Sequence, residues 1–168
     1  NDARTAESLP ALTRNDALDA AAMLKAQDMI SKGYFAHYAP DGTTPWHWLD
    51  KAGYRYASAG ENLAIDFVDS KDVVDAWMKS PTHRANIVKQ KYTEIGMAVA
   101  EGQFNNHQTI FVVQYFGMPA TPAAAVVAPI APTLLAPVAI NASNTPAAGR
   151  VLAPAPRPAT STATSSVA

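Results

Sequence analysis

Cysteine is absent from the 168-residue chain. Its absence excludes a thiol nucleophile, a disulfide framework and a zinc site with cysteine ligands, but it does not fix the cellular compartment. No run of about 18 consecutive apolar residues occurs, so the sequence predicts no membrane span. Stripes of Lys and Arg with interleaved aromatics are missing, which argues against a nucleic-acid partner. Because the chain starts at Asn1 and not at Met, the lack of a signal peptide is uninformative.

The composition changes sharply at Pro119. Nine of the 13 prolines lie from that residue onward, whereas every Trp, Tyr, Phe, Asp and Glu lies before it. We therefore predict one folded domain over residues 1–118, which holds 14 acidic and 11 basic residues. Residues 119–168 are expected to form an Ala/Pro/Ser/Thr-rich linker or tail. The apolar stretch VVAPIAPTLLAPVAI leaves open the alternative that part of the tail docks on the domain.

Apolar periodicity and capping residues predict helices and strands in alternation. Helices are expected over residues 15–32, from Thr44 through WHWLDKAG, from Ser70, and from Ser80 as N-cap. Strands are expected over residues 59–65, 95–100 and 109–116, the last two joined around Asn105-Asn106. In the last strand both alternating sets of side chains are mainly apolar, so both of its faces should be covered. The simplest architecture is an α-β-α sandwich with about three strands.

Two of the four histidines occupy places where local structure would hold them. His37 lies between a helix end and the turn signature Pro40-Asp41-Gly42, and His83 is the third residue of a helix that starts after Ser80. The helix dipole and the unpaired N–H groups of that first turn disfavour an imidazolium. His83 should therefore be biased toward the neutral form, which a metal or a proton needs.

Glu61 in AGENLA is the leading carboxylate, because it could bind a metal, orient a histidine or polarise a water. Asn86 shares the helix face of His83, and Glu94 in YTEIG is a weaker candidate for the same cleft. The spacing of these residues matches no local ligand pattern such as H-E-x-x-H, and no G-x-S-x-G, P-loop or Rossmann fingerprint is present. A polar cluster whose members only satisfy one another therefore stays an alternative.

Five segments occur in a characteristic order, GYFAHYAPDGTTPW, AGENLA, VVDAWMKSPTHRANI, YTEIG and VVQYFG. Together they resemble the CAP superfamily, the cysteine-rich secretory, antigen 5 and pathogenesis-related 1 group, and they are nearest to its cysteine-free bacterial SCP-like extracellular proteins. The resemblance covers about residues 1–118. NDAR at the start resembles the end of the family's first-helix motif, which implies that the chain begins inside that helix.

The resemblance implies an α/β (α+β) protein, a three-layer α-β-α sandwich with a small, mainly antiparallel central sheet and an extracellular or cell-surface location. It also implies a cleft of two histidines and two acidic residues, which in several relatives binds zinc or another divalent ion. By motif these positions are His37, His83 and Glu61, whereas Ser80 replaces the second acid, with Glu94 as a conceivable substitute. Asn86 stands where many relatives have glutamine. The family's sterol-binding loop has no matching motif here.

Three functions are compatible with these residues. The first is a secreted or surface-tethered binding module with a divalent-metal-capable cleft of His37 and His83 supported by Glu61; its ligand is an unknown lipid, glycan, peptide or protein. The second is a metal-assisted, protease-like hydrolase in which Glu61 is the catalytic base. The third is a structural or interaction scaffold whose His/Glu network binds no metal.

Overall fold

The structure, a computed structural model, describes residues 1–121; the tail predicted over residues 119–168 lies outside the described residues from residue 122 onward. The elements are α1 (Asp2–Ala6), β1 (Thr13–Arg14), α2 (Asp16–Lys32), α3 (Trp46–Lys51), β2 (Tyr56–Ile65), α4 (Ser70–Lys79), α5 (Pro81–Ile87), β3 (Glu94–Phe104) and β4 (His107–Pro119). Within residues 1–121 no helix is both long and apolar enough to cross a membrane.

The strands form one sheet in the order β1-β3-β4-β2. The long β3–β4 hairpin and the β2–β4 pair are antiparallel, whereas the short β1 lies parallel to β3. The expected small, mainly antiparallel sheet is confirmed, but it has four strands where about three were predicted. The sequence did not indicate the two-residue β1, because this segment carries no strand signal of its own. Strand β2 lies at one edge of the sheet, a position that matters for the site.

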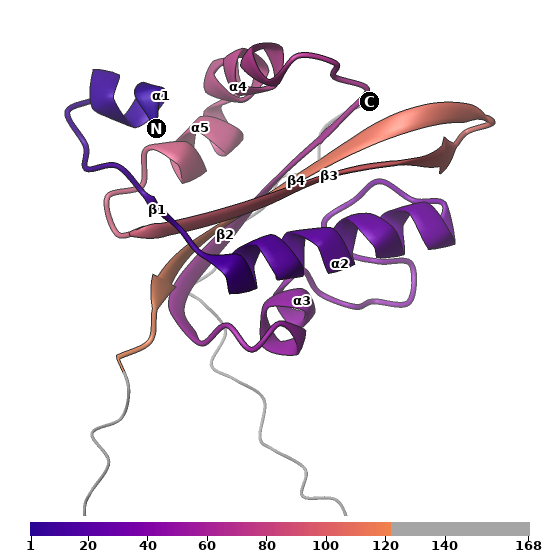
Figure 1. The fold of residues 1–168 in the computed structure, drawn as a ribbon, viewed down its shortest axis with the longest axis horizontal. Helices are drawn as coiled ribbons and strands as arrows, with labels where there is room; N and C mark the ends of the chain where they lie inside the picture. Colours follow the sequence, from indigo (N-terminus) through magenta and orange to yellow (C-terminus); the bar gives the residue numbers. More distant parts are fainter. Residues whose placement is uncertain (122–168) are drawn as a thin grey trace, which may run out of the picture. The chain divides into compact units, whose positions relative to one another are not determined.

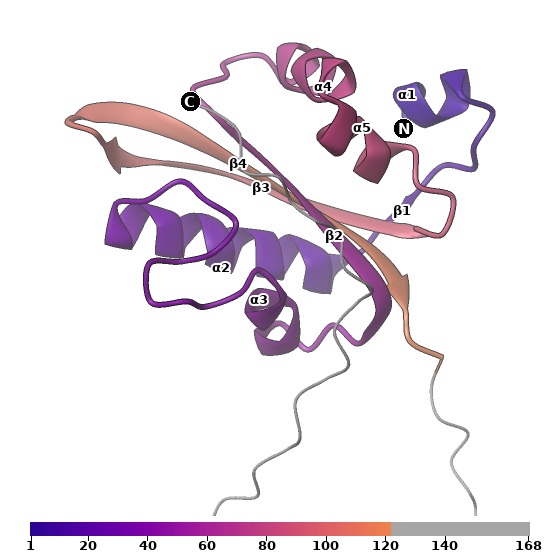
Figure 2. The same cartoon turned by 180° about the vertical axis from the view of Figure 1, so that it is seen from behind.

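Helices cover the sheet on both faces, which confirms the predicted α-β-α sandwich. Helices α2 and α3 lie on one face, and α1, α4 and α5 lie on the other (Figures 1 and 2). Each face has its own cluster of buried side chains, one including Leu18, Leu63 and Val113 and the other including Val73, Trp77 and Phe116. Strand β4 contributes to both clusters, as its two apolar faces predict.

Local signals set the helix ends and the hairpin. The Asn15 side chain accepts hydrogen bonds from the first turn of α2, and Gly33 ends the helix with a φ of 64°, so the helix agrees with the range predicted over residues 15–32. Helix α4 differs, because its N-cap is Asp69 and not Ser70. Asn105 and Asn106 have φ values of 48° and 67°, which suit the predicted tight turn between β3 and β4. His107 opens β4 directly after this turn.

Helix α2 packs unusually closely on β3. A Cβ atom on Gly96 would lie 2.3 Å from the carbonyl carbon of Leu18 and 2.4 Å from the backbone nitrogen of Asp19. Ala21, Ala22 and Ala26 of α2 are fully buried, so only small side chains separate the helix from the rest of the domain on that face. The many alanines of α2 therefore act as a packing surface.

Candidate functional site

The edge strand β2 presents Glu61 and Asn62 on opposite faces of the sheet, because consecutive strand residues alternate. Both side chains are buried, and they pair in register with Tyr115 and Gln114 of β4. The glycine before them leaves room for two side chains: a Cβ atom on Gly60 would lie 2.5 Å from the Tyr92 hydroxyl oxygen and would have to displace it. The segment Gly60-Glu61-Asn62 thus places a carboxylate and an amide on either side of one strand.

His37 lies in the loop after α2 and contacts Glu61 directly. The distance from His37 Nδ1 to Glu61 Oε1 is 2.6 Å, and the exposed fractions of the two side chains are 32% and 2%. A carboxylate oxygen only accepts hydrogen bonds, so Nδ1 of a neutral His37 carries the proton. Within residues 1–121 nothing hydrogen-bonds to Nε2 of this ring, which leaves its lone pair available.

His83 lies in the first turn of α5 on the other side of β2. Its Nδ1 lies 2.9 Å from Ser80 Oγ, and its ring stacks on Trp77 with centroids 6.4 Å apart. Ser80 is the N-cap residue, as predicted, but its hydroxyl contacts His83 and makes no capping bond to the backbone. Because that hydroxyl can accept the Nδ1 proton, Nε2 of His83 can also keep a free lone pair.

The pKa of His83 is lowered, in the direction predicted from its place in the helix. The causes differ from the expected ones: burial is the larger, and the charge of His37 is the second. The fold connects the two imidazoles through β2, because Glu61 contacts the His37 ring and the neighbouring Asn62 bonds to the backbone of His83.

Asn86 supports the site as a hydrogen-bond bridge between α5 and β2. Its Nδ2 donates to the backbone oxygen of Glu61 at 3.1 Å and to Asn62 Oδ1 at 2.9 Å. Asn62 Nδ2 in turn donates to the backbone oxygen of His83 at 3.3 Å. These bonds fix the helix that carries His83 against the strand that carries Glu61.

Glu94 is engaged elsewhere. Its Oε2 accepts a hydrogen bond of 2.6 Å from the Tyr54 hydroxyl, and burial, followed by this bond, raises the pKa of Tyr54. None of the described hydrogen bonds or ion pairs of Glu94 involves His37, Glu61 or His83. The structure therefore brings together four of the five residues singled out from the sequence.

Two residues beside the site were missed by sequence reasoning. The Tyr115 hydroxyl lies near Glu61 but donates its proton to the Pro45 backbone oxygen at 2.8 Å, and Glu61 Oε2 is left without a hydrogen-bond partner among residues 1–121. Lys25 is fully buried and donates to the backbone oxygen of His37 at 2.8 Å. A lysine at an apolar position of α2, four residues before Met29, is the signal that would have revealed it.

The donor chemistry of the site suits a borderline-soft divalent ion only in part. Two imidazole Nε2 atoms are the ligands that zinc prefers, and a carboxylate that orients one of them is the usual outer partner. Within residues 1–121, however, no group of three or more His, Asp or Glu side chains is arranged to hold a metal. Any ion at His37 and His83 would need its remaining ligands from water or from a bound molecule.

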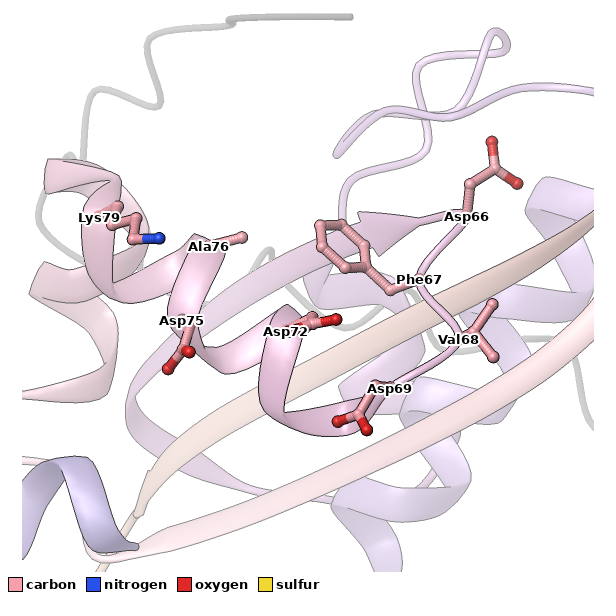
Figure 3. Close-up of a pocket in the computed structure, with 8 residues that line it drawn as sticks. All are labelled: Asp66, Phe67, Val68, Asp69, Asp72, Asp75, Ala76 and Lys79. Atoms are coloured by element: carbon pink, nitrogen blue, oxygen red, sulfur yellow. The ribbon is translucent and has the colours of Figure 1, made fainter.

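A separate surface hollow lies beside α4 (Figure 3). It is lined by Asp66, Phe67, Val68, Asp69, Asp72, Asp75, Ala76 and Lys79. None of the residues that line this hollow belongs to the His37–Glu61–His83 group. Lys79 balances part of its acidic charge, and nothing in the geometry points to a ligand there.

Comparison with known proteins gives consistent results. The profile of the family described as "CAP: Cysteine-rich secretory protein family" matches residues 1–116. The Bacillus subtilis protein YkwD is 37% identical over 101 residues, 60% of this chain, but the match spans only 39% of that protein. An outer surface protein of Borrelia burgdorferi superposes with a TM-score of 0.59 at 26% identity, covering 71% of this chain and 86% of the other. An extracellular, SCP-domain-containing protein of Bacillus anthracis gives 0.57 at 26%, covering 68% and 36%.

Proposed function

The chain belongs to the cysteine-rich secretory protein (CAP) family, and from that premise we propose that it is an extracellular or cell-surface binding module that holds a divalent metal ion between His37 and His83. The observation that carries the proposal is the way both rings are held. Each imidazole is fixed through Nδ1, by Glu61 and Ser80 respectively, and neither Nε2 has a hydrogen-bond partner among residues 1–121.

The proposed location rests on the structural relatives. The Borrelia burgdorferi protein is an outer surface protein, and the Bacillus anthracis protein is extracellular. A divalent ion held by two imidazoles would offer open coordination positions to an oxygen-bearing ligand. The chain's own contribution is to orient His37 through Glu61, to hold α5 against β2 through Asn86, and to keep His83 neutral by burial.

The hydrolase alternative is less well supported, because Glu61 is poorly placed to act as a base. Its side chain is only 2% exposed, and one of its two oxygens is already occupied by His37. A general base must come within hydrogen-bonding distance of the proton that it removes, directly or through one water. Glu61 is better placed to orient His37, so the binding module is the function that the geometry favours.

Zinc titration by calorimetry tests the proposal. We expect the full chain at neutral pH to bind one Zn²⁺ with a Kd on the order of micromolar or tighter, as two imidazoles and an outer carboxylate can provide. The double variant His37→Ala/His83→Ala should lose this binding. His107→Ala is the matched control, because its side chain is 54% exposed and lies on the β3–β4 hairpin.

Three results would count against the binding module. A folded wild-type protein that binds no zinc would favour the scaffold, whose histidines only satisfy hydrogen bonds. Equal binding by the double variant would place the metal elsewhere. Peptide hydrolysis that stops in Glu61→Gln while zinc stays bound would favour the hydrolase.

A further inference from the structure

Lys25 is an unusual residue for the centre of a helix that packs on a sheet. It is fully buried, yet its hydrogen-bond partners, the Tyr34 hydroxyl oxygen at 3.1 Å and the backbone oxygen of His37 at 2.8 Å, are both uncharged. Lysines are almost never fully buried unless a charge compensates them. The position therefore needs an explanation beyond packing.

Hydrogen bonds link Lys25 to one carboxylate and to the backbone of His37. The Tyr34 hydroxyl accepts from Lys25 Nζ and donates to Asp28 Oδ2 at 2.6 Å. Burial lowers the pKa of Lys25, and the charges of Glu61 and Asp28 oppose this effect. Lys25 thus holds the backbone of His37, and Glu61 holds its ring.

We propose that Lys25 is a positioning residue of the His37–His83 site, because it anchors the backbone of His37 while Glu61 orients the ring. With the backbone held in place, Glu61 acts as an acceptor for the Nδ1 proton of His37. Nε2 of His37 is then left to face a ligand. The inference rests on the proposed metal-binding function and extends it to the residue that anchors the His37 loop.

Two substitutions separate positioning from packing. Lys25→Met removes the charge and the donors but keeps an unbranched side chain, and Lys25→Gln removes the charge but keeps an N–H donor. We expect each to weaken zinc binding by about 10- to 100-fold, the usual effect of losing an outer partner of a metal-binding histidine. Lys71→Met, at an exposed lysine of α4, is the matched control and should bind zinc like the wild type.

A second readout needs no metal. Long-range ¹H–¹⁵N correlation spectra of the metal-free wild type should show His37 as a single tautomer protonated at Nδ1. In Lys25→Gln the ring nitrogens of His37 should depart from that pattern, whereas in Lys71→Met they should not. A folded Lys25→Met or Lys25→Gln protein with wild-type zinc affinity and the wild-type His37 tautomer would overturn the inference.

The outcomes for the two proposals can be told apart. If the wild type binds no zinc, the proposed function fails, and the His37 tautomer still decides whether Lys25 positions the ring. If neither Lys25 variant folds, the wild type alone decides: the ¹⁵Nζ resonance of Lys25 should shift when zinc is added, and that of Lys71 should not. An unchanged Lys25 resonance in a zinc-bound protein would refute the positioning role.

Discussion

The two helical layers hold the central sheet by different means. On the α2/α3 face the backbone of α2 itself approaches β3, so that a Cβ atom on Gly96 would lie 2.3 Å from the carbonyl carbon of Leu18. On the α4/α5 face the atoms nearest to Gly60 are the ends of two side chains, Tyr92 and Asn86. One layer thus rests on close backbone packing and the other on side-chain contacts.

The same contrast separates the two histidines of the site. His37 is held by a carboxylate 24 residues away on β2, whereas His83 is held by a hydroxyl only three residues away in its own helix cap. A site between two layers can therefore join one ring fixed by tertiary structure to one fixed locally. Substitutions at matched residues of the two layers test this distinction.

The largest difference is expected between two glycines. Gly96→Ala should lower the free energy of unfolding by about 3 kcal/mol or more, because backbone atoms of α2 cannot move aside without shifting the helix. Gly60→Ala should cost about 1 kcal/mol, since side-chain ends can adjust. Urea denaturation measures both values. Equal losses at the two positions would show that the α4/α5 layer is as unyielding as the α2/α3 layer.

Two buried tryptophans give the next comparison. Trp77 donates its indole N–H to the Leu63 backbone oxygen at 3.0 Å, whereas the indole N–H of Trp48 has no hydrogen-bond partner within residues 1–121. Trp77→Phe should therefore cost about 2–3 kcal/mol, from a lost bond and lost packing. Trp48→Phe should cost about 1 kcal/mol, from packing alone. Thermal and urea unfolding check this order, which a larger loss in Trp48→Phe would reverse.

The smallest expected effect is a pH dependence that belongs to the α4/α5 layer. The pKa of His83 in the folded protein lies below its ordinary value of 6.5, so the unfolded chain takes up a proton first as the pH falls. The stability of the metal-free protein should hence be full above pH 6.5 and decline below it, down to the lowered pKa of folded His83. Urea unfolding with a chelator present, in His83→Asn against wild type, measures this contribution.

In His83→Asn the decline of stability below pH 6.5 should be shallower than in the wild type. His107→Asn serves as the control, because that exposed residue lies on the hairpin and away from the site. If the free energy of unfolding of His83→Asn falls with pH as steeply as that of the wild type, burial of His83 does not disfavour its charged form in solution.

Features set by local sequence were predictable. The caps at Asn15 and Gly33, the Asn105-Asn106 turn and the helix start at Ser80 each depend on a few neighbouring residues. The five ordered motifs extended this to the family and the sandwich. Strand β1 was not predictable, because its two residues become a strand only by pairing with β3.

The sequence could name candidate residues for the site but not their geometry. The sequence indicated His37, Glu61, His83 and Asn86, whereas the partner of each ring depends on how β2 lies between two layers. Glu94 illustrates the limit, since it was a candidate for the cleft but lies at the start of β3 with its side chain bonded to Tyr54. Lys25 shows the opposite case. The sequence displays a charged residue among the apolar positions of α2, but its contact with the His37 backbone follows only from the fold.

The position of β2 has a consequence for how the protein behaves in a crowded solution. An outer strand with unpaired backbone groups is a template on which another chain can add and start aggregation. Here the Glu61 and Leu63 carbonyl oxygens already accept hydrogen bonds from Asn86 and Trp77, so over this segment an incoming strand would have to displace both side chains. The bonds that assemble the site therefore also protect this edge against self-association.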